Sequence, residues 1–253
     1  KNGIDEQTAN KIYDEMIDFA KYAFNKSHAA AYAVVSYQTA WLKYYYPVEY
    51  MAALMTSVID NPTKVAEYIY VCRQMGIRIL PPDINKGEGS FSVDSGNIRY
   101  GLAAIKSIGK PVIESIIKER KNGGPFSNLK DFIERLSGKE VNKRTIESFI
   151  KSGAFDSLGG TRKQFMVVYV QILDQVNRER KYSMTGQLSL FDIVSDDQKS
   201  QFDIPLPDVG EYEKETKLAF EKEVLGVYLS GHPLEDYEEK WRKNISRTTL
   251  DFQ

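Results

Sequence analysis

Cysteine and histidine are nearly missing from this sequence of 253 residues. Cys72 is the only cysteine, so the chain cannot form an internal disulfide, and its composition fits a reducing compartment such as the cytoplasm. The two histidines, His28 and His232, lie far apart in the sequence. A structural zinc site is therefore not expected.

Long apolar runs are also missing. The longest candidate, residues 29–35, is far shorter than the ~20 residues of a membrane span, so we expect no membrane partner. There is no secretory signal, and the first residue is Lys1 rather than Met, which suggests a piece of a longer chain. The apolar content of 42% is enough for a core and excludes a fully disordered chain.

The small net charge of −1 hides two opposed blocks. Residues 99–163 contain 14 Lys or Arg against 7 Asp or Glu, and residues 192–239 contain 4 Lys against 14 Asp or Glu. The basic block could face nucleic acid, whereas the acidic block could not easily do so. On charge alone, two solvated surfaces are the simpler interpretation.

The apolar spacing predicts a mainly α fold with a small β region. A β-like run at 77–80 and a hairpin around the turn at 94–97 interrupt the helices. A linker or extended surface segment is predicted over 177–215. Helices are predicted over 5–23, 27–45, 47–55, 63–75, in short pieces over 102–176, and over 212–225. The helix over 27–45 is apolar on most of its surface, so it should be buried or face a partner.

One candidate site lies at a predicted helix start, in residues 24–32. Asn25 or Ser27 could cap this helix. The positive helix end beside Lys26 and His28 could then meet a phosphate. The alternative is a capped helix whose Lys and His are simply exposed.

A second candidate lies within the basic block. In residues 105–113, apolar residues alternate with small ones around a tight turn, where Gly109 allows close backbone approach. With Lys106, Ser107 and Lys110, this pattern is typical of a helix-hairpin-helix unit, which grips duplex phosphates without reading bases. A second such unit is predicted over 146–158, with these residues in or near it: Lys143, Arg144, Lys151 and Gly153. An ordinary helical corner is the alternative.

A third candidate is a short apolar motif in the predicted linker. Leu188, Leu190 and Phe191 stand in an otherwise polar stretch, next to Gln187 and Ser189. Such residues are typical of a linear motif that docks in a partner's pocket, with Leu190 and Phe191 as anchors. They could equally pin the linker to its own domain.

Patterns for catalysis are missing. The sequence has no Asp-x-Asp pair, no P-loop and no nucleophile elbow. We therefore predict no catalytic residue, no metal ligand and no cofactor within these residues.

Several segments together resemble the bacterial DNA polymerase III alpha subunits, the replicative polymerases of the C family. The resemblance covers essentially the whole chain, and its signatures are residues 24–32, 36–47, 80–85, 152–156, 187–191 and 223–233. It implies the C-terminal fingers with a small β region over 1–100, a tandem helix-hairpin-helix domain over 101–176, and a clamp-binding segment and linker over 177–253. The catalytic palm would lie upstream of this chain and an OB domain would follow it.

The resemblance also implies roles for the candidate residues. The helix near Ser27 would help to form the nascent base-pair pocket, with the following residues facing nucleotide or template: Asn25, Lys26, Ser27, His28 and Tyr32. Residues 187–191 match the motif for the sliding clamp (beta subunit). Ser107 departs from the family pattern, because such hairpin loops usually carry glycine there.

The implied partners are double-stranded primer–template DNA, the sliding clamp, other replicase subunits and, for the full-length enzyme, an incoming deoxynucleotide with Mg²⁺ held in the palm. This chain alone should be inactive as a polymerase. Two alternatives stay open: a stand-alone, non-catalytic adaptor that binds DNA and the clamp, and an error-prone paralogue of the polymerase.

Overall fold

The computed structural model describes residues 3–21, 26–136, 138, 141–184 and 204–246. The chain divides into two compact units, residues 1–47 and residues 48–253. The domain boundaries expected near residues 100 and 176 both fall inside the second unit, whose apolar core runs continuously from Met51 to Val227. The architecture is mainly α with one small sheet, which confirms the predicted fold class.

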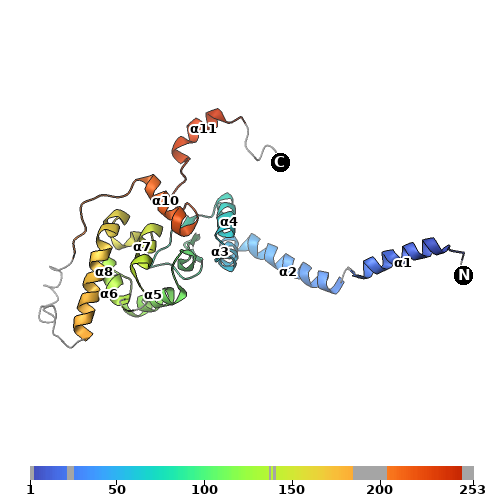
Figure 1. The fold of residues 1–253 in the computed structure, drawn as a ribbon. Coiled ribbons are helices and arrows are strands. Elements are labelled where there is room, and N and C mark those ends of the chain that lie inside the picture. Colours follow the sequence, from blue (N-terminus) through green and yellow to red (C-terminus); the bar gives the residue numbers. More distant parts are fainter. Residues whose placement is uncertain (1–2, 22–25, 137, 139–140, 185–203, 247–253) are drawn as a thin grey trace. The chain divides into compact units, whose positions relative to one another are not determined.

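The first unit contains helices α1 (Glu6–Lys21) and α2 (Lys26–Tyr45), shown in blue in Figure 1. Asp5 caps α1 by accepting hydrogen bonds from the Thr8 backbone N–H at 2.8 Å and the Thr8 hydroxyl at 2.7 Å. These bonds lower the pKa of Asp5. Within this unit the apolar surface of α2 is exposed, Tyr37 and Tyr44 most of all. The unit therefore does not itself bury the apolar surface of α2.

The second unit begins with two helices that each carry proline in the first turn, α3 (Pro47–Ser57) and α4 (Pro62–Gln74). Asn61 caps α4 by accepting the backbone N–H of Lys64 at 3.1 Å. The two helices bury Met55 against Cys72, whose sulfur atoms lie 4.0 Å apart. The single cysteine is thus part of the core.

A three-stranded sheet follows, in the order β1 (Ile79–Leu80), β3 (Asn97–Arg99), β2 (Ser92–Asp94). The predicted hairpin is β2 and β3, and its turn places Ser95 and Gly96 at positive φ, as a tight two-residue turn requires. β1 pairs with β3 in parallel, with Ile79 opposite Ile98. That pairing joins segments far apart in the sequence, so local patterns did not reveal it.

The rest of the unit is a compact helical array (Figure 1). Its elements are η1 (Leu102–Ala104), α5 (Lys110–Gly123), α6 (Leu129–Leu136), α7 (Lys143–Ser152), η2 (Asp156–Leu158) and α8 (Arg162–Met184). Aromatic rings fill its centre: Phe132 packs on Phe155 with ring centroids 4.9 Å apart, and on Phe149 at 5.9 Å. These edge-to-face contacts hold α6, α7 and the turn after α7 together.

Helix α8 is longer than the sequence pattern predicted. Residues 177–184, expected to be linker, continue the helix to Met184. Arg178, Glu179 and Lys181 have high helix propensity, and Gln175 donates to Glu179 at 2.8 Å one turn later. Their polarity therefore marks an exposed helix surface and not the end of the helix.

Residues 204–213 form neither helix nor strand and lie against the start of α8. Thr161 donates its hydroxyl to the carbonyl of Gly210 at 2.6 Å, and Gln164 donates to the carbonyl of Pro207 at 2.9 Å. The predicted helix α10 (Lys214–Leu225) then packs on α7 and ends at Gly226, which has positive φ. η5 (Glu235–Tyr237) and α11 (Glu238–Asn244) follow.

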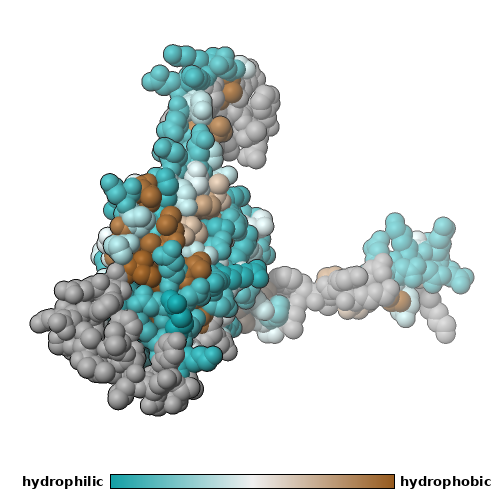
Figure 2. Space-filling view, turned by 60° about the vertical axis from the view of Figure 1, so that its left-hand side comes forward, coloured by the Kyte–Doolittle hydropathy of each residue, from teal (hydrophilic) through white to brown (hydrophobic). Residues whose placement is uncertain are grey.

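Hydrophilic side chains cover much of the visible face of the second unit, around one group of apolar residues (Figure 2). In the part of the chain that the structure describes, no helix is both long enough and apolar enough to span a membrane.

Candidate nucleic-acid interface

The first predicted hairpin is the loop between η1 and α5. Ser107 has φ +71°, a left-handed conformation that residues other than glycine rarely adopt. Gly109 has an ordinary φ of −81° and caps the start of α5. A Cβ atom at Gly109 would meet only Cδ of Pro111, at 3.6 Å, which is normal van der Waals contact. The fold thus favours glycine at position 107, where serine stands, and does not need it at 109.

The two lysines of this hairpin differ in their contacts. Lys106 donates its backbone N–H to the carbonyl of Val224 and its ammonium to the carbonyl of Glu223, both at 2.9 Å. The Lys110 side chain is exposed and forms no hydrogen bond or ion pair with any described residue. Lys110 is therefore available to an external anion, whereas Lys106 helps to hold the end of α10.

The second predicted hairpin joins α7 to α8 through a turn at residues 153–155. Asn142 caps α7 by accepting the Thr145 backbone N–H at 3.1 Å, and Gly153 ends it with φ +81°. A Cβ at Gly153 would collide with the guanidinium of Arg162 and lie 2.9 Å from the Asp156 carboxylate. The fold itself thus requires glycine at this turn.

The charged residues of the second hairpin are mostly engaged within the molecule. The Lys151 ammonium lies 2.8 Å from carboxylates of both Glu147 and Glu223, and its side chain is only 15% exposed. Burial alone would lower the pKa of Lys151, but the bonds to Glu147 and Glu223 outweigh it and raise that pKa. Lys143 pairs with Asp174 at 3.4 Å. Arg144 is exposed and unpaired among the described residues.

Helix α2 carries the residues predicted to face nucleotide or template. Ser27, His28 and Tyr32 lie in its first two turns, and the rings of His28 and Tyr32 are in contact, tilted at 50° with their centroids 4.4 Å apart. Tyr32 is 60% exposed. Lys26 is the first residue of α2, one position before the predicted start of this helix, while Asn25 lies outside the described residues. The helix start thus presents an imidazole and a phenol on one face.

The predicted clamp motif lies outside the described residues. Gln187, Leu188, Ser189, Leu190 and Phe191 all fall within 185–203. The structure describes the two flanking positions, Met184 at the end of α8 and Ile204 at the start of the extended segment.

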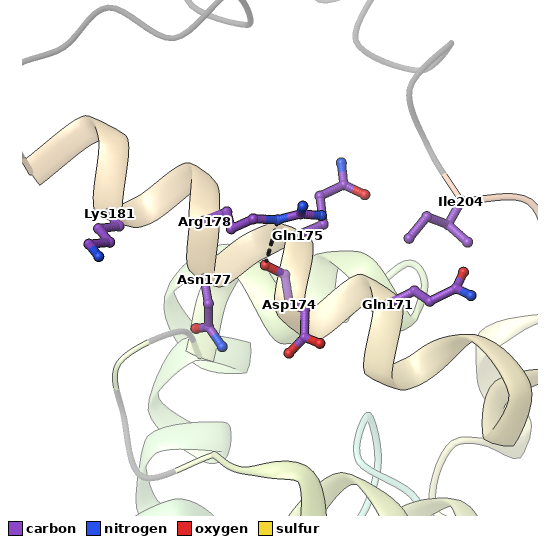
Figure 3. Close-up of a pocket in the computed structure, with 7 residues that line it drawn as sticks. All are labelled: Gln171, Asp174, Gln175, Asn177, Arg178, Lys181 and Ile204. Carbon is purple, nitrogen blue, oxygen red and sulfur yellow. Dashed lines mark hydrogen bonds between the residues drawn. The ribbon is translucent and has the colours of Figure 1, made fainter.

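Side chains of α8 line a shallow depression together with Ile204 (Figure 3). Amide and charged side chains line it, with Arg178 donating to the Asp174 carbonyl at 3.3 Å, and Ile204 closes one side. It contains one carboxylate and no nucleophile paired with a base. Among the described residues, no group of three or more His, Cys, Asp or Glu could hold a metal ion.

Sequence reasoning missed that the acidic segment docks on the basic one. Glu223 contacts Lys151, and the buried Glu221 pairs with Arg162 at 3.3 Å. Tyr100 also donates its hydroxyl to the carbonyl of Leu225 at 2.9 Å. The opposed charges of residues 99–163 and 192–239 were the signal for this contact, because adjacent blocks of opposite sign attract.

Comparison with known proteins gives two findings. A family model described as a helix-hairpin-helix motif matches residues 76–165, which include both hairpins. A DNA polymerase III subunit alpha of Vibrio cholerae is 43% identical over 97% of this chain. The same-named protein of Escherichia coli strain K12 is 44% identical over 99% of the chain, and that of Mycobacterium tuberculosis is 43% identical over 92%.

The chain spans about one-fifth of the length of these relatives, 20–22%. The similarity nevertheless runs through both units and confirms the resemblance that the motifs indicated. Over nearly all of its own length, the chain therefore corresponds to one segment of the DNA polymerase III alpha subunits, and residues 76–165 of it match a helix-hairpin-helix motif.

Proposed function

We propose that this chain is the part of a replicative DNA polymerase that holds the duplex product and positions the enzyme on it. The observation that carries the proposal is the first hairpin, an exposed loop at Gly109 with a free lysine beside it, inside a helix-hairpin-helix match. A glycine that the fold does not need leaves room for a close ligand. Binding of this kind contacts phosphates and is independent of base sequence.

The contacts of the predicted DNA-binding residues within the fold distinguish those that are available to a phosphate from those that are already engaged. Lys110 and Arg144 are exposed and unpaired among the described residues, so they favour a role as phosphate ligands. The Lys106 ammonium donates to the backbone carbonyl of Glu223, and the Lys151 ammonium pairs with the Glu223 carboxylate. Binding of either lysine to DNA would therefore break a contact that supports the fold. Ser107 and Gly153 act through loop conformation.

In the full-length enzyme we propose that α2 contributes a surface facing nucleotide or template, through Lys26, His28 and Tyr32. The exposed ring pair of His28 and Tyr32 supports this role, because an aromatic face can stack on a base. Mg²⁺ and the carboxylates that hold it in the palm would supply the phosphoryl-transfer chemistry. Within this chain the residues bind and orient, and the isolated chain should not extend a primer.

Residues 187–191 complete the proposal as the docking motif for the sliding clamp. They lie between α8 and the segment at 204–213, which Thr161 and Gln164 fasten to the start of α8. A clamp bound there would keep the enzyme beside its template and raise the effective concentration of the DNA-binding surface. A cytoplasmic replicase with further subunits is the assembly to which such a chain would belong.

Gly109→Ala tests the duplex-binding role. The added methyl meets no atom of the fold closer than 3.6 Å, so thermal stability should change little while affinity for duplex DNA falls. Affinity is measured by fluorescence anisotropy with a labelled duplex of mixed sequence over a range of KCl concentrations. Unchanged affinity together with unchanged stability would contradict the proposed hairpin contact.

The alternative, a stand-alone adaptor that binds DNA and a clamp, shares both binding surfaces. Relatives about five times longer than the chain, named as polymerase subunits, favour the polymerase. The discriminating observation is the native gene. A continuous reading frame that encodes a palm before Lys1 supports the polymerase, and a start codon immediately before it supports the adaptor.

A further inference from the structure

We infer that the outward face of α5, formed by Lys110, Lys118 and Lys121, binds the phosphate backbone of the duplex alongside the hairpin. The inference rests on the proposed function and extends it from one loop to a whole helix face. Lys118 and Lys121 belong to no motif that the sequence pattern singled out. The family match covers them but assigns them no role.

The support for this face is the division of the cations in residues 99–163 into those that have a partner within the molecule and those that have none among the described residues. Most of the described Lys and Arg residues between 99 and 163 are used inside the molecule, by ion pairs or by bonds to carbonyls. These are Arg99, Lys106, Arg120, Lys130, Arg135, Lys143, Lys151 and Arg162. The remaining side chains, which contact no partner among the described residues, are Lys110, Lys118, Lys121, Arg144 and Lys163. Three of these five lie on α5.

Helical geometry brings those three lysines to one side. Lys118 and Lys121 follow Lys110 by eight and eleven residues. At ~3.6 residues per turn, these spacings keep the three side chains within about a quarter of a turn of one another. All three are exposed, and the opposite side of α5 is buried through Val112, Ile113 and Ile116. The lysines therefore cannot reach the core and project into solvent.

The dimensions fit a nucleic-acid backbone. Eleven residues at ~1.5 Å of rise place Lys110 and Lys121 about 16 Å apart along the axis. A DNA strand carries a phosphate every ~3.4 Å of duplex axis, so the face spans about five phosphates. Flexible lysines suit such a contact, because each can follow a phosphate without fixed geometry.

One carboxylate lies on this face. Glu114 stands four residues from both Lys110 and Lys118, and among the described residues it pairs with neither. Near a phosphate backbone, an unpaired carboxylate repels the ligand. Removing the charge of Glu114 should therefore raise the affinity for DNA, whereas removing a lysine charge should lower it.

The test uses the 253-residue chain and a labelled duplex of mixed sequence, with anisotropy measured over a range of KCl. Lys118→Gln with Lys121→Gln should reduce the slope of log K against log salt by about 1.8, since each lost phosphate contact accounts for ~0.9. Glu114→Gln should tighten binding several-fold at low salt. The matched control is Lys11→Gln with Lys243→Gln, which removes the same charge from exposed lysines that lie outside residues 76–165 and form no ion pair with a described residue.

The outcomes separate this inference from the proposed function. A changed slope only for the α5 pair, with tighter binding by the Glu114 variant, supports it. An equal effect from the control pair would overturn it, because net charge alone would then explain the loss. If Lys110→Gln weakens binding but the Lys118 and Lys121 pair does not, the inference fails and the hairpin role stands. A chain that binds no duplex at all overturns both.

Discussion

Arg162 and Glu221 lie 59 residues apart in the sequence and meet in the interior, with Nη1 3.3 Å from Oε1. Their side chains are 5% and 1% exposed. The second oxygen of Glu221 accepts the backbone N–H groups of Leu229 and Ser230, at 2.9 and 3.0 Å. One buried carboxylate thus ties α10 to the start of α8 and to the turn that follows α10.

Glu221→Gln should lower the free energy of unfolding by about 3 kcal/mol, because it leaves the Arg162 charge with one partner fewer in a buried site. A glutamine would also turn an N–H donor toward groups that donate. Urea unfolding followed by circular dichroism measures the change. The control is Glu223→Gln, which is more than half exposed and should cost under about 1 kcal/mol. Equal costs for the two variants would contradict the buried-pair assignment.

Ser107→Gly should raise the free energy of unfolding by about 1 kcal/mol. Serine at φ +71° pays a steric cost that glycine avoids. The gain should appear in the same urea experiment, whereas Gly109→Ala should leave stability nearly unchanged, since residue 109 has an ordinary φ. A less stable glycine variant would show that the serine side chain itself supports the loop.

Leu190→Ala with Phe191→Ala should abolish measurable binding of the chain to a sliding clamp. Each fully buried apolar side chain contributes ~1.5–3 kcal/mol, so losing two weakens binding by more than about a hundredfold. Calorimetric titration of the clamp measures the affinity. Ile193→Ala with Val194→Ala removes similar apolar area just after the motif and should have little effect. Clamp affinity that survives the first pair would assign docking to another segment.

Cys72 should make stability depend on pH in the alkaline range. Burial raises the pKa of its thiol from the ordinary 9.0 to about 11. The folded state therefore favours the neutral thiol, and its contribution is complete below pH 9 and is lost as pH rises toward 11. The stability difference between the unmodified chain and Cys72→Ala should shrink by about 2–3 kcal/mol over that window, at ~1.4 kcal/mol per unit.

Urea unfolding at a series of pH values measures that difference. Tyr100 is also buried, with a raised pKa, but it is present in both proteins, so its titration cancels. A difference that stays constant from pH 9 to 11 would show that the thiolate is tolerated in the folded state.

The sequence alone determined the local elements and the family. Proline in the first turns of α3 and α4 and the turn at Ser95 and Gly96 follow from neighbours in the chain, because helix starts and tight turns involve residues a few positions apart. The helix-hairpin-helix pattern and the polymerase motifs are likewise continuous segments.

Only the tertiary structure decided which charges are free. Lys106 and Lys151 look like DNA ligands in the sequence, yet Glu223 and Val224, which engage them, come from a helix about 70 to 120 positions later. The lysines of α5 look no different from these in the sequence. Charge pairing depends on distance in space, so the contacts of Lys106 and Lys151 with Glu223 were decided by the place that α10 takes in the fold.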